Sequence, residues 1–148
     1  MPVLTGESIP AQSPLESVTA NDWVLIKAGS RHMQFAAGAE IIRQDSPGGT
    51  MFFLSKGTAK IVVNGETVVA RLAAGQICGE VAFLDNRKSS ASVIAEEPVE
   101  ADAIEWSELH RIFRMFPHVG ARFYHSLAVL LSKRLRETSV RLAECKCL

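Results

Sequence analysis

The chain has 148 residues, of which 47% are hydrophobic and 22% are charged. This length suffices for one domain with a sizeable core, and the composition is that of a globular rather than a disordered protein. The 16 lysine and arginine residues balance the 16 aspartate and glutamate residues, so the formal net charge is zero. A neutral chain has no overall electrostatic attraction for nucleic acid. Because we also find no nucleic-acid-binding motif, we expect no nucleic-acid partner.

Cysteine usage and the N-terminal residues indicate the compartment. The three cysteines, Cys78, Cys145 and Cys147, are too few and too unevenly spaced for a disulfide framework, which favours a reducing environment. The N-terminus lacks the basic start and apolar run of a signal peptide, and no apolar run is long enough to span a membrane. We therefore predict a cytoplasmic protein with no membrane partner.

The chain begins with a segment typical of a flexible arm, followed by a short helix. Residues 1–17 contain three of the six prolines and several small polar residues, which favours an arm without regular structure. Thr19 or Asn21 is a suitable N-cap for the helix that follows, and Gly29 is a typical residue at a helix end.

From Arg31 to about Glu105 the sequence consists of short apolar runs separated by glycine-containing turns. Short strands at this spacing favour an antiparallel roll or sandwich. Asn64-Gly65 is the strongest hairpin signal, because both residues tolerate the positive φ of a tight turn. The region therefore predicts an antiparallel β-roll.

Two helices are predicted after Glu105. Apolar residues at helical spacing, with Ser107 as a cap, predict a first helix that Pro117 ends. A longer helix with one apolar face follows and ends near Ala143. The residues on that face are Phe123, Leu127, Leu130, Leu131 and Leu135. The predicted fold class is α+β, mainly β: a jelly-roll-like antiparallel β-roll flanked by an N-terminal helix and two C-terminal helices.

This reading divides the chain into an arm over residues 1–17, a domain over 18–142 and a tail over 143–148. The tail ends in Cys145-Lys146-Cys147-Leu148, which has the outward form of a prenylation box, but lysine stands at an aliphatic position. A Cys-x-Cys metal clip is another alternative, but further ligands are lacking. We therefore predict an unstructured tail and no metal site.

Two segments carry a resemblance to a known family. Residues 35–63 match the pattern F-x-x-G-x-x-I-x-x-Q-G-D followed by F-x-x-x-x-G at most of its defined positions, and residues 72–95 match in part the pattern F-G-E-x-A-L followed by P-R-x-A-x-V. Over roughly 18–142 the chain thereby resembles the cyclic-nucleotide-binding domain family. The resemblance implies a regulatory module that binds cAMP or cGMP, with no catalytic residue and no cofactor. The matching residues are Phe35, Gly38, Ile41, Gln44, Phe53, Gly57, Gly79, Glu80, Ala82, Ala91 and Val93.

The second segment suits a ligand that carries a phosphodiester anion, a ribose 2′-hydroxyl and a flat base. Glu80 can accept a charge-assisted hydrogen bond from the hydroxyl, and Gly79 lets the backbone pass close because it has no Cβ. A helical turn after Glu80 would present free amides to the anion. The expected ligand-binding residues are Gly79, Glu80, Val81, Ala82, Arg87, Lys88, Ser89, Ser90 and Ala91, with Leu127, Leu130 and Leu131 as a lid over the base.

The sequence departs from the family pattern where the phosphate is expected. Ser89 stands at the place of the family's arginine, Lys88 replaces the preceding proline, and Cys78 replaces the phenylalanine before Gly79. A serine hydroxyl is a weaker phosphate partner than a bidentate guanidinium, so we expect Ser89→Arg to strengthen binding. Arg87 and Lys88 are alternative cations if their loop turns inward, but we favour a solvated loop.

The C-terminal helix is both basic and amphipathic. Glu137 and Glu144 interrupt its cations, which favours a solvated face over a nucleic-acid or membrane surface. Its leucine face can close over the roll or pair with a second copy, so a homodimer through this helix is left open. The cations are Lys133, Arg134, Arg136 and Arg141.

Three functions compete. We favour a sensor of cAMP or cGMP that signals through its C-terminal helices. The alternative, motivated by Ser89, is a degenerate domain that serves as a protein-interaction scaffold without nucleotide binding. An enzyme is disfavoured, because a metal-binding β-roll of the cupin type needs histidines on its strands and no nucleophile here has a base. Only His32 falls in the strand region, while His110, His118 and His125 fall in the helical region.

Overall fold

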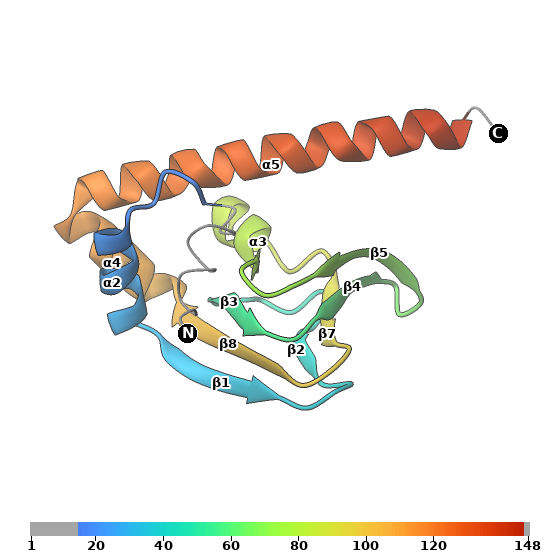
Figure 1. Cartoon of the computed structure of the whole chain (residues 1–148), viewed down its shortest axis with the longest axis horizontal. Helices are drawn as coiled ribbons and strands as arrows, with labels where there is room; N and C mark the ends of the chain where they lie inside the picture. The colour runs from blue at the N-terminus through green and yellow to red at the C-terminus, as the bar shows by residue number, and fades with distance from the viewer. Residues whose placement is uncertain (1–14, 147–148) are drawn as a thin grey trace, which may run out of the picture.

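The computed structural model describes residues 15–146 and shows a roll of two β-sheets with helices against it (Figure 1). This arrangement confirms the predicted α+β fold with its antiparallel β-roll, one helix before it and two after it. The elements in chain order are α2 (Ala20–Ala28), β1 (Arg31–Phe35), β2 (Glu40–Ile42), β3 (Thr50–Lys56), β4 (Ala59–Val63), β5 (Thr67–Leu72), β6 (Ile77–Cys78), α3 (Glu80–Asp85), β7 (Ser92–Ala95), β8 (Val99–Glu105), α4 (Trp106–Met115) and α5 (Pro117–Lys146).

The two sheets have the strand orders β1-β8-β3-β6 and β2-β7-β4-β5, and their pairings are antiparallel. The first and last strands of the roll are neighbours, since Arg31 lies opposite Ala103 and Phe35 opposite Val99. The predicted hairpin joins β4 to β5, where Asn64 and Gly65 have φ values of 57° and 78°. Both residues thus adopt the left-handed backbone that made this turn recognisable.

Two apolar cores hold the roll and the helices together. The first contains side chains from both sheets, such as Phe52 of β3 and Val93 of β7. The second joins the helices to strands β3, β6 and β8 through residues that include Met51, Ile104 and Leu127. Burial of these side chains from water stabilises the fold. The second core also includes α3, so the position of α3 depends on the helices around it.

The helix starts agree in part with their predicted caps. Thr19 caps α2 in a reciprocal capping box with Asp22, which confirms the first of the two predicted caps. The predicted cap Ser107 is wrong, because α4 begins at Trp106 and its N-cap is Glu105, two residues before Ser107. The backbone N–H of Trp106 donates to the carbonyl of Gly49 at 2.9 Å. Pro117 separates α4 from α5 as predicted and occupies the first turn of α5.

The segment before α2 and α2 itself are tied to α5. The buried carboxylate of Asp22 accepts two hydrogen bonds from Arg122, at 2.7 and 2.9 Å. Residues 15–17 were assigned to the flexible arm, but Leu15 is buried in the second core, and the backbone N–H of Ser17 donates to Ser126 Oγ at 2.8 Å. The apolar side chain of Leu15 and a polar anchor therefore order these residues. Residues 1–14 lie outside the described part of the chain.

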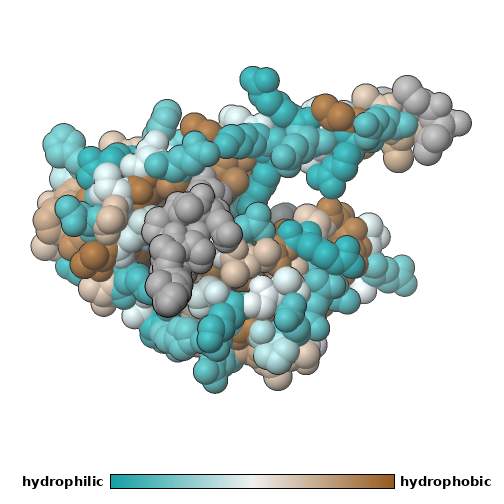
Figure 2. Space-filling view, in the orientation of Figure 1, coloured by the Kyte–Doolittle hydropathy of each residue, from teal (hydrophilic) through white to brown (hydrophobic). Residues whose placement is uncertain are grey.

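Helix α5 extends further than predicted and leaves the roll behind. It continues to Lys146 instead of ending near Ala143, and residues 135–145 are all exposed. Figures 1 and 2 show its C-terminal part projecting from the body, with open space between it and the roll. Leu135, predicted on the buried face, is 67% exposed because the contacts with the body end before it. None of the helices within residues 15–146 is long and apolar enough to cross a membrane.

Candidate ligand pocket

The candidate site is built around the turn between β6 and α3. Gly79 has φ 91° and leads directly into α3, which begins at Glu80. A Cβ at residue 79 would lie 2.9 Å from the carbonyl oxygen of Thr50. Glycine is therefore required by both the backbone conformation and the close approach of β3. The close approach expected from the sequence was to a ligand, whereas the structure shows one to the protein's own strand β3.

A cavity of about 160 Å³ lies beside this turn. Seven of the nine predicted ligand-binding residues line it, from both the α3 turn and the segment that leads into β7. Glu80 is only 5% exposed, and Ser89 is 8% exposed. The lining residues are Ile42, Ile61, Ile77, Cys78, Gly79, Glu80, Val81, Ala82, Ser89, Ser90, Ala91, Val93 and Arg134.

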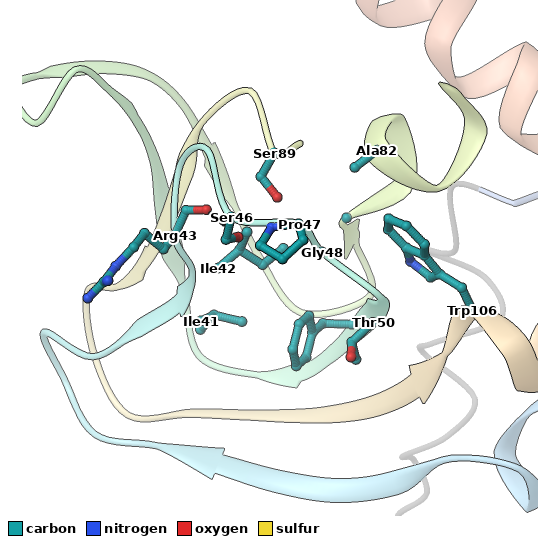
Figure 3. A pocket seen from close by; sticks show the side chains of 12 residues that line it. Ile41, Ile42, Arg43, Ser46, Pro47, Gly48, Thr50, Ala82, Ser89 and Trp106 are labelled. Carbon is teal, nitrogen blue, oxygen red and sulfur yellow. Dashed lines mark hydrogen bonds between the residues drawn. The ribbon is translucent and has the colours of Figure 1, made fainter. Parts of the chain in front are cut away.

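A second cavity of about 190 Å³ adjoins the first and shares Ile42, Gly79, Ala82 and Ser89 with it. Figure 3 shows its labelled residues: the loop from Ser46 to Gly48 lies on one side and the indole of Trp106 on the other. The two cavities together make a concave surface on both sides of the buried Ser89.

Backbone hydrogen bonds fix the position of Ser89. Its N–H donates to the carbonyl of Ser46 at 3.0 Å, and its carbonyl accepts from the N–H of Asp45 at 2.8 Å. Ser89, which follows α3, is therefore held by the loop after β2. This anchoring keeps Ser89 at the boundary of the two cavities.

Arg87 and Lys88 lie in the loop between α3 and β7. Both are exposed, and neither lines either of the two cavities. The backbone N–H of Arg87 donates to Asp85 Oδ1 at 3.0 Å, which stabilises the turn after α3. In this conformation the two cations face solvent, as the favoured alternative in the sequence analysis proposed.

The cation that does reach the cavity is Arg134 of α5. Its NH1 group donates a hydrogen bond to Glu80 Oε2, and the two side chains form an ion pair that bridges α5 and α3. The Glu80 side chain is 6% exposed and that of Arg134 is 32% exposed. The expectation of a fully solvated basic face is thus wrong for Arg134, although Arg136 and Arg141 are exposed. A buried carboxylate needs a counter-charge, and α5 provides it.

The predicted lid residues occupy a different place. Leu127 and Leu130 are buried in the core between the helices and the roll, and Leu131 is half-buried. None of these leucines lines either of the two cavities. Their side chains hold α5 against the body, so that the next turn of the helix brings Arg134 to the cavity.

Phe83 connects the pocket to the C-terminal helices. It lies in α3 and is 6% exposed. Its ring stacks on His110 of α4 at a centroid distance of 5.1 Å and on Tyr124 of α5 at 6.0 Å. Such aromatic pairs add to the stabilisation from burial. The pocket-lining turn is therefore packed directly against both helices.

The histidines fall where the sequence analysis placed them, with His32 on β1 and the others on α4 and α5. His32 contacts Glu100 at 3.0 Å and Asp102 at 3.3 Å on the outside of the roll. Within residues 15–146 no group of three or more His, Cys, Asp or Glu side chains is placed to hold a metal ion. Cys147 of the considered Cys-x-Cys clip lies outside the described residues.

Known proteins share this fold and these sequence patterns. The cyclic AMP receptor protein of Thermus thermophilus is 30% identical over 112 residues, which cover 73% of this chain and 50% of that protein. Glutaminase 1 of Bradyrhizobium diazoefficiens is 29% identical over 126 residues, covering 84% of this chain but 20% of the enzyme. A cyclic nucleotide-binding domain from Methylobacillus flagellatus KT superposes with a TM-score of 0.79 at 18% identity, covering 95% of this chain and 92% of that domain.

The chain thus spans half or less of the length of these two curated relatives. A family profile described as "Cyclic nucleotide-binding domain" matches residues 32–115, which include the β-roll, the pocket-lining turn and α4. This profile describes a ligand-binding domain. Because the match covers more than half of the sequence, the chain belongs to the cyclic nucleotide-binding domain family.

Proposed function

We propose that the chain is a regulatory module that binds cAMP or cGMP in the cavity beside α3. The observation that carries this proposal is the position of Glu80, a nearly buried carboxylate that lines the same cavity as Ser89, Ser90 and Ala91. Glu80 accepts a hydrogen bond from the ribose hydroxyl, and the small side chains of Ser89, Ser90 and Ala91 leave room for the phosphate. Relatives of the chain support both ligands, since they include a cyclic AMP receptor protein and a cyclic GMP-binding protein.

Calorimetric titration with cAMP and with cGMP tests this proposal. We expect saturable binding of at least one nucleotide by the wild-type chain. Glu80→Gln removes the charge of the acceptor and should weaken that binding about tenfold, the equivalent of about 1.4 kcal/mol. Glu66→Gln, a matched change of an exposed carboxylate in the β4–β5 turn, should leave the affinity unchanged. If neither nucleotide binds at millimolar concentration, the proposal is wrong.

A protein-interaction scaffold without nucleotide binding is the second candidate. It is favoured by Ser89 in place of the family's arginine and by the exposure of Arg87 and Lys88. In this case neither nucleotide would bind, and neither would protect the folded chain against thermal unfolding. The same titrations therefore distinguish the two candidates.

We further propose that α5 pairs with α5 of a second copy to form a homodimer. From Ala128 to Cys145 its exposed or half-buried small or apolar residues recur at alternating spacings of three and four, the pattern of a coiled-coil seam. Leu135 is 67% exposed and Leu142 is 60% exposed, so both are available to a partner. The seam residues are Ala128, Leu131, Leu135, Thr138, Leu142 and Cys145.

Light scattering after size-exclusion chromatography tests the pairing. The wild-type chain should have twice the mass of one chain, and Leu135→Glu should give the mass of a single chain. Val140→Glu is the matched control, because Val140 is 57% exposed but lies off the seam. A monomeric wild-type chain, or equal effects of the two substitutions, would contradict the seam.

The absence of a nucleic-acid partner stays a prediction, and a titration with labelled duplex DNA tests it.

A further inference from the structure

We propose that Arg134 of α5 binds the ligand's phosphate in this chain. It thereby takes the role of the family's arginine, in whose place this chain has Ser89. This inference rests on the proposed nucleotide-binding function. It assigns the anion to a residue of the C-terminal helix, outside the segment that carries the family's phosphate-binding pattern.

The first argument is the position of the available cations. A phosphodiester is an anion and needs a cation or several strong donors in a partly desolvated site. Among the described residues that line the cavity beside α3, Arg134 is the one cationic side chain. Arg87 and Lys88 are exposed and lie outside it.

Arg43 is the cation of the adjoining cavity, but it is unsuited to the role. Its side chain is 76% exposed and contacts Glu40 at 3.4 Å. In Figure 3 its guanidinium points away from the other labelled residues. A charge in this position is strongly screened by water.

The second argument is the geometry of the guanidinium. Arg134 lines the same cavity as Ser89, Ser90 and Ala91 and is the residue that α5 contributes to the described lining. It donates to Glu80 through NH1, and a guanidinium has five N–H donors in a planar fork. One edge can therefore stay on Glu80 while another donates to a phosphate oxygen. The same pairing orients the carboxylate of Glu80 as an acceptor for the ribose hydroxyl.

The position of Arg134 also defines how binding is transmitted. An arginine at residue 89 would hold the phosphate from the roll alone. Arg134 instead lies on the last turn of α5 that contacts the body, directly before the exposed seam residue Leu135. A phosphate held by Arg134 therefore ties α5 to the roll at the root of the projecting segment.

The test compares Arg134→Met with the wild-type chain, since methionine keeps helix propensity and an unbranched side chain but removes the charge. Affinities are measured by calorimetry for cAMP and cGMP, and by NMR titration for adenosine and guanosine, which lack the phosphate. We expect a 10- to 100-fold loss for the cyclic nucleotide, as roughly 1.5–3 kcal/mol implies, and at most a twofold change for the nucleoside. Arg136→Met, two residues further along the same helix and exposed, should change neither.

A double-mutant cycle with Glu80 separates direct phosphate binding from simple neutralisation of the carboxylate. If Arg134 binds the phosphate, Arg134→Met still weakens cyclic-nucleotide binding in the Glu80→Gln background. If it only neutralises Glu80, the loss disappears in that background and the inference is overturned. Ser89→Arg should restore binding to Arg134→Met. Contrary to the expectation from the sequence alone, it should add little to the wild-type chain, because Arg134 already supplies the cation.

Two other outcomes are decisive. A wild-type chain that binds neither cyclic nucleotide overturns both this inference and the proposed function. A wild-type chain that binds, with an unchanged affinity in Arg134→Met or equal losses for nucleotide and nucleoside, overturns the inference alone. Circular dichroism and thermal melting of each variant establish that it is folded.

Discussion

The packing of Phe83 makes a quantitative prediction about how the pocket-lining turn is held. Phe83→Ala removes a ring that is 6% exposed and lies against His110 at 5.1 Å, Trp106 at 6.0 Å and Tyr124 at 6.0 Å. Because these contacts join α3 to both C-terminal helices, their loss should destabilise the whole domain and not only the turn.

The magnitude follows from the burial of the ring. Truncation of a buried phenylalanine to alanine costs about 3–5 kcal/mol, including the cavity that remains. With a urea dependence of about 2 kcal/mol per molar for a domain of this size, the unfolding midpoint should fall by roughly 1.5–2.5 M. Single domains have a free energy of unfolding of about 5–15 kcal/mol. We therefore expect a variant that still folds in water but unfolds at a lower urea concentration than the wild-type chain.

Urea unfolding followed by circular dichroism is the assay, and Leu84→Ala is the control. Leu84 is the next residue of the same helix but is 41% exposed, so its truncation should cost less than about 1 kcal/mol. Hydrogen exchange adds a local measure, because α3 and the first turns of α5 should both lose protection in Phe83→Ala. Equal losses of stability in the two variants would refute the role assigned to the ring.

Two further predictions concern residues outside the pocket. Hydrogen bonds from Arg122 lower the pKa of Asp22 from 3.8 to about 2. Because the folded-state pKa is the lower one, the pair should stabilise the fold fully above pH about 4 and lose its effect as the pH falls toward 2. Asp22→Asn should therefore cost about 1–2 kcal/mol at pH 7, after allowance for the partial exposure of Arg122, and much less at pH 2.5, and a pH-independent difference would contradict this. Gly57→Ala should unfold the domain at a clearly lower urea concentration than Gly38→Ala, because both glycines have φ near 87° but only the Cβ at residue 57 would lie 2.3 Å from the carbonyl oxygen of Pro98.

The fold was predictable wherever a local feature of the sequence decides the local structure. The Asn64-Gly65 turn, the Thr19 cap and the break at Pro117 depend on the backbone preferences of single residues. The order of the strands was not predictable in this way. It requires β1 to pair with β8, although Arg31 and its partner Ala103 are far apart in the sequence, and no spacing rule connects them.

The length and burial of α5 show the same limit. Apolar residues at helical spacing predict a helix with one buried face, and Leu127 and Leu130 do lie in the core. Leu135 continues that face but is 67% exposed, because the body of the protein ends before it. Periodicity identifies which residues share a face of the helix, but not where the surface that covers this face stops.

The pocket-lining residues that lie in one contiguous segment of the sequence were predictable. Arg134 was not, because folding brings it to the cavity from a distant helix. In the sequence Arg134 cannot be told from Arg136 or Arg141, which share its helix and its charge. The structure distinguishes it because the side of α5 that carries Arg134 faces α3, where the carboxylate of Glu80 is nearly buried. A buried carboxylate requires a counter-charge within hydrogen-bond distance, and the nearest cations in the sequence, Arg87 and Lys88, are exposed. The partner of Glu80 therefore had to come from an element distant in sequence. A long helix packed against the pocket-lining turn, with a cation just past its last buried leucine, meets that requirement.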